Sequence, residues 1–445
     1  MKEHWTLALT LFALTSCDRS DLLLGSSFGS GGAPGLDGGP KSEDSSMLPL
    51  TLTPGSPFLL AQDTVRSFSA SGGAKPYSFA ATFGAVDSTG RYTAPSTSNV
   101  DTVGVTDSAG ASASTQLVIV SNVALTSAKP LAGTTLATDG QEIWCIYGST
   151  FDGVYLYFAV GLTGGGSLVV RMDPTGNFVV CARNGGSDSI DFDGTYLYAL
   201  DGSSSYILNK FLPSQCNTDG TFAHALDLSS TGVLVPDVTL GTGVGRAALY
   251  AIVAGRAGHL YLSSSAATTG VFEVDTTTGA ISPFVSISGQ PTGMALSKDG
   301  RQLYVANLGN NVVQVVDLAT RTVTAVAGSG VAAELDGTGG SAEFYNPSGV
   351  ATDGTYLYVV DNGAGTVRQI DISSGAVTTL AGGGNQQYWT GSTTYASVNA
   401  LSSAGMAGLS ENILFLAPGA SGAFAPGLYF GFGAFPSNAG FGKIN

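Results

Sequence analysis

Short apolar and β-branched runs, separated by glycine-containing turns, follow one another along most of the chain. The clearest example is Asn346–Gly382, which breaks at Asp353-Gly354, Asn362-Gly363 and Ser374-Gly375. Such pairs form tight turns, because glycine tolerates positive φ and Asn or Asp side chains bond nearby backbone. The runs between them predict four strands of an antiparallel meander: Gly349–Thr352, Tyr356–Val360, Thr366–Ile372 and Ala376–Leu380.

The signature Asp-Gly-x-x-Leu-Tyr marks this unit as a repeat. A four-stranded meander buries a face only by stacking on copies of itself, so the repeat predicts a ring or an array of small sheets. We find no long apolar stripe at helical spacing, and the predicted fold class is therefore all-β. The signature begins at Asp152, Asp193, Asp299 and Asp353, with a shortened copy at Gly258–Tyr261 and a drifted copy at Glu411–Phe415.

Two units align without a gap: LYVANLGNNVVQVVDLATRTVTAVAG from Leu303 and LYVVDNGAGTVRQIDISSGAVTTLAG from Leu357. They resemble NHL-type repeats and, more loosely, the YVTN repeats of bacterial surface propellers. The resemblance implies a six-bladed β-propeller over residues 123–445. The last unit lacks an outer strand, and Gly133–Ala137 (GTTLA) is similar to the missing one. We therefore expect a strand that precedes the first blade to close the ring.

Residues 48–122 form a separate block of alternating segments with turn signals between them. This spacing predicts a small β-sandwich. The phrases SFSASGGAKPYSF and DSTGRYTAPSTSNVDTVGVTDSAG resemble bacterial Ig-like domains of surface proteins. The block lacks the cysteine pair and the tryptophan of antibody domains, so Phe79 or Tyr77 is expected to fill the core position. Such modules act as spacers or as binders, and no residue here favours binding.

The N-terminal segment 1–17 has the features of an export signal. A weakly basic start is followed by the apolar Trp5–Leu14, which is too short to span a bilayer. The sequence Leu14-Thr15-Ser16-Cys17 resembles a bacterial lipobox, which implies that Cys17 becomes the lipidated first residue of the mature protein. An ordinary cleaved signal with an incidental cysteine is the alternative. Residues 18–47 are Gly- and Ser-rich, as expected of a disordered tether.

Charge is sparse and acidic, which argues against nucleic acid as a partner. Charged residues make up 11% of the chain, the net charge is −15, and 63 residues are glycine. Binding to a phosphate backbone needs clustered Lys and Arg, whereas the 17 basic residues here are scattered. The expected location is the bacterial cell envelope, on the periplasmic side or at the cell surface, with the membrane contacted through the lipid anchor.

Polar residues follow the second strand of several units, and we expect them at the mouth of the channel: Asp201, Asn307, Asp361 and Asn362. In lactonase propellers, acidic and amide residues around the channel hold calcium, so the resemblance offers a calcium-dependent lactonase or hydrolase as the alternative function. The repetition of these residues favours a simpler role, in which their side chains bond the adjacent turn. Carboxylates and amides clustered in the channel would favour the hydrolase; an apolar or Ser/Thr lining would favour a binding protein.

The sequence shows no other pattern typical of a catalytic or metal-binding site. The three histidines lie at His4, His224 and His259 and have no metal-ligand spacing, so no zinc or copper site is predicted. The loop Gly328–Gly340 carries Glu334 and Asp336 without the spacing of an EF-hand. No cofactor is therefore predicted, with calcium left open.

Cysteine pairing remains open at this point. Export permits a disulfide, and Cys181 could reach Cys216 in the insertion of the neighbouring unit; buried free thiols are the alternative.

Because the repeats are clear and a reactive site is not, the expected function is a non-enzymatic binding or scaffolding module for a protein or glycan. Insertions and degenerate units, where the repeat fails, are the places to look for a site.

Overall fold

The computed structural model describes residues 48–382 with interruptions, together with 413–416, 426–432 and 440–444. The interruptions are residues 56, 98, 121–124, 131–142, 163–166, 175–177, 185–186, 202–206, 217–225, 228–232, 235–248, 256–257, 265–268 and 279. Within these limits the protein is all-β, as predicted, and its helical segments are short 3-10 turns. The described part contains no helix with the length and apolar character needed to cross a membrane. The predicted signal, the tether and Cys17 lie outside the described residues.

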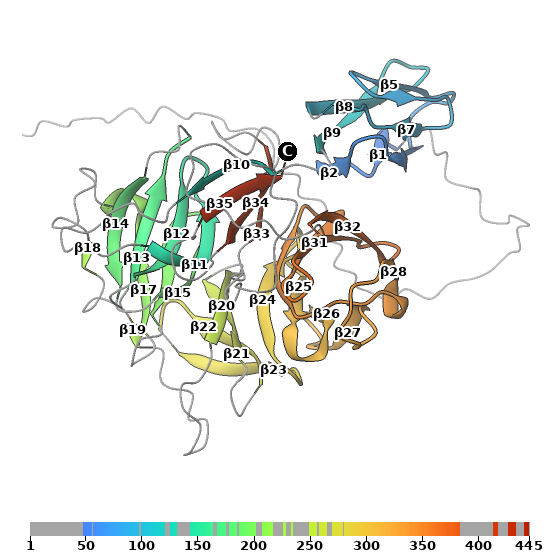
Figure 1. The fold of residues 1–445 in the computed structure, drawn as a ribbon. Coiled ribbons are helices and arrows are strands. Elements are labelled where there is room, and N and C mark those ends of the chain that lie inside the picture. The colour runs from blue at the N-terminus through green and yellow to red at the C-terminus, as the bar shows by residue number, and fades with distance from the viewer. Residues whose placement is uncertain are drawn as a thin grey trace, which may run out of the picture. The chain divides into compact units, whose positions relative to one another are not determined.

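The first block contains three small sheets (Figure 1). The largest has the order β2 (Phe58–Ala61), β9 (Ser112–Val120), β8 (Asn99–Thr106) and β5 (Ser78–Ala81). The second consists of β3 (Val65–Ser67), β7 (Arg91–Thr93) and β6 (Ala85–Val86), and the third pairs β1 (Thr51–Thr53) with β4 (Ser69–Ser71). We call this block, residues 48–120, the N-terminal domain.

Aromatic side chains form the centre of the N-terminal domain, but not the ones expected. Phe58, Phe68 and Tyr92 are buried, and the Phe68 ring meets the Tyr92 ring edge-on at 6.0 Å. Tyr77 and Phe79 are only partly buried against this core. The expected central role therefore passes to Tyr92, whose hydroxyl donates to the buried Asp101 carboxylate at 2.6 Å. A buried Tyr needs such a partner, and nothing in the local sequence indicates which aromatic residue has one.

Six further sheets follow in chain order, and we number them sheets 1 to 6. Sheet 1 has β11 (Ile143–Phe151), β12 (Leu156–Leu162), β13 (Ser167–Met172) and β14 (Phe178–Asn184), with β18 (Leu226–Asp227) added at its edge. Sheet 2 has β15 (Ser187–Phe192), β16 (Leu197–Asp201), β17 (Ile207–Phe211) and β19 (Val233–Leu234). Sheet 3 has β20 (Leu249–Ala254), β21 (His259–Ser264), β22 (Gly270–Asp275) and β23 (Ile281–Ser286).

The remaining sheets repeat this order. Sheet 4 has β24 (Pro291–Leu296), β25 (Gln302–Asn307), β26 (Val312–Asp317) and β27 (Val323–Ala327). Sheet 5 has β29 (Pro347–Thr352), β30 (Tyr356–Asp361), β31 (Thr366–Asp371) and β32 (Ala376–Gly382), with β28 (Gly337–Thr338) paired to β32. Sheet 6 has β33 (Ile413–Leu416), β34 (Gly427–Phe432), β35 (Gly440–Ile444) and, from far earlier in the chain, β10 (Leu125–Pro130).

The first strands of the six sheets contact one another in a closed circuit. β11 contacts β15, β15 contacts β20, β20 contacts β24, β24 contacts β29, β29 contacts β33, and β33 returns to β11. Sheet 6 is completed by antiparallel pairing of β10 with β35, in which Leu125 lies opposite Ile444 (Figure 1). A strand before the first sheet thus supplies the outer strand, as expected. It is Leu125–Pro130, whereas the expected Gly133–Ala137 lies outside the described residues.

Each of the first five sheets has a register shift in its first strand, next to a small residue. In sheet 1 this residue is Gly148, where a Cβ would come within 2.6 Å of the Ile190 backbone in the next sheet. In sheet 4 it is Gly293, where a Cβ would lie 2.5 Å from the Ser348 carbonyl oxygen. These bulges let neighbouring first strands approach closely around the central axis.

The repeated Asp-Gly-x-x-Leu-Tyr signature is a turn device. In sheet 5, one Asp353 oxygen accepts the backbone N–H groups of Thr355 and Tyr356, each at 2.7 Å, and the other accepts the Tyr358 hydroxyl. Asp152 and Asp193 make the same three bonds in sheets 1 and 2. The aspartate caps the turn and also satisfies a tyrosine buried beside the sheet, which explains why the two residues recur together.

Candidate functional site

The four residues predicted at the channel mouth share a backbone position but do not form one site. Asn307, Asp361 and Asp201 each end the second strand of their sheet, opposite the first residue of the first strand. The side chain of Asp201 lies outside the described residues. Asn362 begins the turn after Asp361, where its carbonyl oxygen accepts the Gly365 N–H at 3.3 Å. Asn307, Asp361 and Asn362 do not belong to the described lining of the central cavity, which is treated below.

Asn307 is fully buried and its side chain serves the local turn. Its Oδ1 accepts the backbone N–H groups of Gln290 at 3.0 Å and Asn310 at 3.2 Å. Its Nδ2 donates to the Ser288 carbonyl at 2.7 Å and to the Gln314 side chain at 2.9 Å. Every polar atom of this amide is used within sheet 4 and its flanking turn, so it has no free donor or acceptor for a ligand.

Asp361 is the equivalent residue of sheet 5 and is also fully buried. It accepts the Tyr345 N–H at 2.7 Å and pairs with the guanidinium of Arg368 at 3.2 Å. Burial dominates its electrostatics and raises the pKa of Asp361 to about 7, while the Tyr345 bond and the Arg368 charge act in the opposite direction. The carboxylate therefore titrates near neutral pH although it faces an arginine.

Arg368 fixes the insertion that precedes sheet 5, residues 329–345. Its guanidinium has no exposed surface and donates to the Glu343 carbonyl at 3.0 Å and to the Asp336 carboxylate at 2.8 Å. It also lies over the Phe344 ring, 5.1 Å from the ring centre. β28 within the insertion pairs with β32, so the segment is attached to sheet 5 by backbone and by side chains.

The insertion exposes a group of large apolar side chains. Val331 is 55% exposed, Leu335 51% and Tyr345 43%, while the carboxylates of Glu334 and Asp336 lie between them in the sequence and are exposed as well. We call these five exposed residues of the insertion the insertion face. The insertion itself contains Glu334, Asp336 and Glu343 and no Lys or Arg, and only Asp336 of the three is paired with Arg368 through its carboxylate, so the insertion face is acidic as well as apolar.

The N-terminal domain bonds to sheet 5 through strand β2. The Leu59 N–H donates to the Tyr358 hydroxyl at 3.0 Å, and the Leu59 carbonyl accepts from the Gln369 side chain at 2.9 Å. Arg66 adds an ion pair to Asp371 at 2.6 Å. The ring of Phe58 meets the ring of Tyr356 edge-on, with 5.4 Å between their centres. Sheet 5 thus has specific partners for the preceding domain.

A cavity of about 240 Å³ lies where the six first strands meet. Its described lining is aliphatic side chains, alanines, Met294, three Ser or Thr residues (Ser149, Ser189 and Thr352) and a single charged residue, Asp191. This lining matches the expectation for a binding protein more closely than the cluster of carboxylates and amides expected of a calcium-dependent hydrolase. Across the described part of the chain, no three His, Cys, Asp or Glu side chains converge in a way that could hold a metal ion.

Asp191 links three sheets. Its Oδ1 accepts the Thr150 hydroxyl of sheet 1 at 2.9 Å, and its Oδ2 accepts the Ala254 N–H of sheet 3 at 2.7 Å. Loss of hydration in this interior site raises the pKa of Asp191 above its ordinary value, and the three hydrogen bonds that it accepts offset this in part. The turn-based reasoning from sequence missed Asp191. A comparison of the first strands would have found it, because the equivalent residues in sheets 1, 3, 4 and 5 are Thr150, Val253, Ala295 and Ala351.

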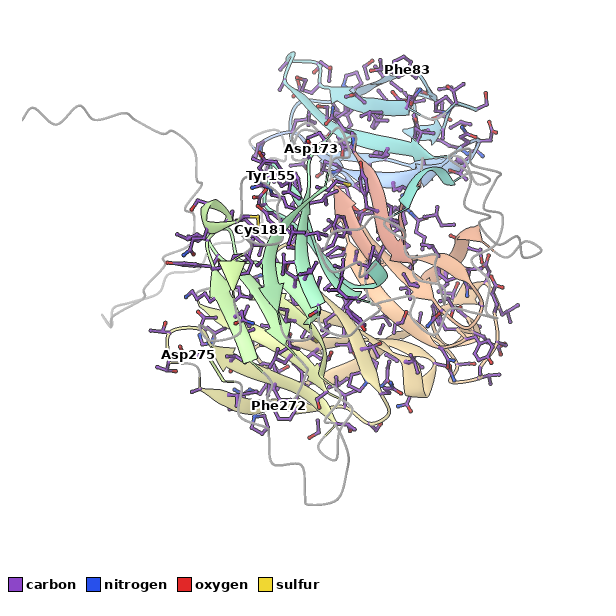
Figure 2. The ribbon with its side chains drawn as sticks, turned by 60° about the vertical axis from the view of Figure 1, so that its left-hand side comes forward. Phe83, Tyr155, Asp173, Cys181, Phe272 and Asp275 are labelled. Atoms are coloured by element: carbon purple, nitrogen blue, oxygen red, sulfur yellow. A yellow bond between two sulfur atoms is a disulfide. The ribbon has the colours of Figure 1, made fainter. Side chains whose placement is uncertain are left out.

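Cys181 and Cys216 form a disulfide, the first of the two alternatives that the sequence left open (Figure 2). It ties β14 of sheet 1 to the segment after β17 of sheet 2, and both cysteines are buried. The side chain of Cys145 lies outside the described residues. Because the disulfide joins two neighbouring sheets from within their shared apolar core, we assign it a structural role.

Comparisons with known proteins indicate the fold and little more. No protein-family model matches the sequence. Over 86 residues the chain is 33% identical to Protein SUPPRESSOR OF QUENCHING 1, chloroplastic, of Arabidopsis thaliana, a match that spans 19% of this chain and only 8% of that protein.

Among solved structures, a structural genomics protein of unknown function from Bacteroides thetaiotaomicron is similar with a TM-score of 0.54 and 13% identity, covering 90% of this chain and 99% of that one. An auxiliary nutrient binding protein from Bacteroides ovatus has a TM-score of 0.43 and 15% identity over 78% of this chain and 89% of its own. Together with the circuit of small sheets, the first of these structures supports an all-β, propeller-like fold.

Proposed function

We propose that this protein is an exported, lipid-anchored binding module of the cell envelope. In this proposal sheets 1 to 6 are the blades of a six-bladed NHL-like propeller, residues 48–122 are an Ig-like sandwich, and Cys17 carries the lipid. The propeller is non-enzymatic and presents a rigid surface to a partner. Two observations support a count of six blades: the closed circuit of first strands, and the pairing of β10 with β35, which completes sheet 6.

The insertion face is the observation that carries the proposal. Exposed apolar side chains lower solubility, and a group of them often marks an interaction site. Val331, Leu335 and Tyr345 are exposed on a segment that the buried Arg368 holds in place. Aromatic and aliphatic side chains on a preorganised surface are typical of protein interfaces, because little entropy is lost on binding. Its acidic residues favour a protein partner with a basic, apolar surface.

The lactonase alternative has less support from the site. It requires several oxygen ligands around one cation in the channel. The described lining supplies one carboxylate, Asp191, and two of its acceptor positions are already used by Thr150 and Ala254. A glycan partner is the other alternative, for which Tyr345 would be the stacking residue.

Site-specific photo-crosslinking tests the partner. A photoreactive phenylalanine at Tyr345 should crosslink to a discrete protein in the native envelope, whereas the same residue at the more exposed Val154, in the turn between β11 and β12, should not. Adding Leu335→Asp should remove the crosslink, because a carboxylate in an apolar contact is desolvated at high cost. Equal crosslinking at both positions, or a crosslink that survives Leu335→Asp, would contradict a protein-binding insertion face; retention on a glycan array that is lost in Tyr345→Ala would favour the glycan.

The anchor has a separate test. Cys17→Ala should move the protein from the membrane fraction to the soluble fraction, because lipidation supplies most of the membrane affinity. Intact-mass measurement of the mature protein should show acyl chains on Cys17 of the parent. An unmodified Cys17 in a membrane-bound protein would exclude this anchor and leave the binding proposal standing.

A further inference from the structure

Asp191 departs from the repeat at a position that lines the central cavity. The first strands of sheets 1, 3, 4 and 5 have Thr150, Val253, Ala295 and Ala351 at this place, all uncharged. Structural residues of a repeat are copied from unit to unit, as the turn aspartates of this chain are. A carboxylate that appears once, in an interior cavity, therefore needs a local explanation.

The electrostatics of the cavity are unbalanced. No Lys, Arg or His is among the described lining residues, so Asp191 has no counter-charge there. Its three hydrogen bonds come from neutral donors, namely the Thr150 hydroxyl and the N–H groups of Ala254 and Phe192, and leave one of the roughly four acceptor positions of a carboxylate unused. Ser149, from the neighbouring first strand, adds a buried hydroxyl oxygen without a hydrogen-bond partner to the same cavity.

We propose that the central cavity binds a small organic ammonium ion, with Asp191 as its counter-charge and Ser149 as a second acceptor. A protonated amine supplies what the site lacks, namely a positive charge with several N–H donors. The aliphatic lining, which includes Ile252, Met294 and Val350, suits the hydrocarbon part of such a ligand. A bare inorganic cation is a worse match, because it needs several oxygen ligands and the described lining offers few.

The size of the cavity limits the ligand. At about 30 Å³ for each water molecule, 240 Å³ corresponds to about eight waters, and hence to a ligand of about eight non-hydrogen atoms. Burial raises the pKa of Asp191, which means that the protein surroundings disfavour its charged form. A cation would reverse this and stabilise the carboxylate. The inference concerns a different place from the insertion face and does not depend on the partner proposed there.

Calorimetric titration of the full chain with cyclohexylammonium chloride tests the inference, with cyclohexanol as the neutral ligand of matched shape. We expect saturable binding of the amine at millimolar concentration and at least about 10-fold weaker binding of the alcohol, which is the factor that 1.4 kcal/mol represents. In Asp191→Asn, amine affinity should fall about 10-fold or more, because the amide retains the size but loses the charge. Equal affinity for amine and alcohol, unchanged affinity in Asp191→Asn, or binding of potassium alone would overturn the proposal.

A second variant guards against loss of the fold. Ala295→Leu enlarges a lining residue of sheet 4 and leaves Asp191 and its hydrogen-bond partners Thr150, Phe192 and Ala254 untouched. Amine binding should be lost in this variant while its circular dichroism spectrum stays that of the parent. Full binding in a folded Ala295→Leu protein would show that the amine binds elsewhere and would also contradict the inference.

Discussion

Asn307 of sheet 4 and Asp361 of sheet 5 end the same strand of two units that align without a gap, yet their partners differ in kind. In sheet 4 the Asn307 amide bonds to Gln314, a neutral residue on the neighbouring strand. In sheet 5 the residue equivalent to Gln314 is Arg368, and it forms an ion pair with Asp361. The neutral pair is satisfied by its own sheet and turn. The charged pair is not, and Arg368 takes its remaining partners from the insertion, Glu343 and Asp336.

The same comparison explains why the N-terminal domain bonds to sheet 5. Tyr356 and Gln369, which contact that domain, correspond to Gln302 and Val315 in sheet 4. Sheet 5 therefore differs from sheet 4 in a buried ion pair, an attached insertion and bonds to the N-terminal domain, although the strands of the two sheets follow the same order. The specialised unit is where we place the protein-binding surface.

Arg368→Leu should produce the largest difference between the two sheets. At pH 8 it leaves the Asp361 carboxylate buried without a counter-charge, at a cost of about 3–5 kcal/mol. Gln314→Leu in sheet 4 removes one neutral bond of Asn307 and should cost about 1 kcal/mol. Urea unfolding of both variants measures these losses, and similar values for the two would mean that the ion pair contributes no more than the amide pair.

Stability should fall as the pH rises from about 4 to about 7. Burial raises the pKa of Asp361 to about 7 and that of Asp353 to about 6, from an ordinary value of 3.8. The folded state therefore binds more protons than the unfolded state in this window, and folding loses several kcal/mol of free energy as they dissociate. Asp371, whose pKa is lowered to about 2, acts in the opposite sense and below pH 4.

Thermal unfolding midpoints across this pH range check the sign. Asp361→Asn gives sheet 5 the amide of sheet 4, and it should flatten the upper part of the decline while the contribution of Asp353 remains. A midpoint that rises between pH 4 and pH 7 would contradict this account of both carboxyl groups.

Gln369→Val gives sheet 5 the residue of sheet 4 and removes the bond to the Leu59 carbonyl. We expect a loss of about 1 kcal/mol, the usual net value of one hydrogen bond. Amide exchange in residues 58–61 should become faster, while exchange in β25 of sheet 4 stays unchanged. Unaltered protection of residues 58–61 would show that this bond does not hold the N-terminal domain to sheet 5.

The double variant Asp361→Asn/Arg368→Gln should have the smallest effect. It converts the charged pair into the amide pair of sheet 4, and replacing both partners of a buried ion pair is often close to neutral, here within about 1 kcal/mol of the parent. Urea unfolding should show this rescue relative to Arg368→Leu. A loss as large as that of Arg368→Leu would mean that the arginine acts mainly through the insertion rather than through Asp361.

Local interactions account for what the sequence could predict. The turn aspartates bond to residues two, three and five positions ahead, so their pattern was legible and located the strands of sheets 1, 2 and 5. The shared position of Asn307 and Asp361 could be predicted for the same reason.

Contacts between distant segments were the ones that could not be predicted. Gly133–Ala137 (GTTLA) resembles the fourth strand of the other units more closely than Leu125–Pro130 (LTSAKP) does. It is nevertheless Leu125–Pro130 that pairs with β35, and this pairing could not be predicted from local composition. The sequence did not show that Arg368 fixes the insertion, because its partners Glu343 and Asp336 lie 25 and 32 residues earlier in the chain. Asp191 was visible only as an exception to the repeat, and a search for recurring polar positions passes over exceptions.

The pairing of Leu125 with Ile444 sets an order on folding. β10 is among the first strands of the propeller-like part to be synthesised, and its partner β35 follows all the other strands of that part in the sequence. Until β35 arrives, sheet 6 cannot form and the circuit of first strands stays open, with unpaired edges at both ends. The chain therefore spends its synthesis as an open arc, and a truncation near the C-terminus should disturb the first sheets as much as the last.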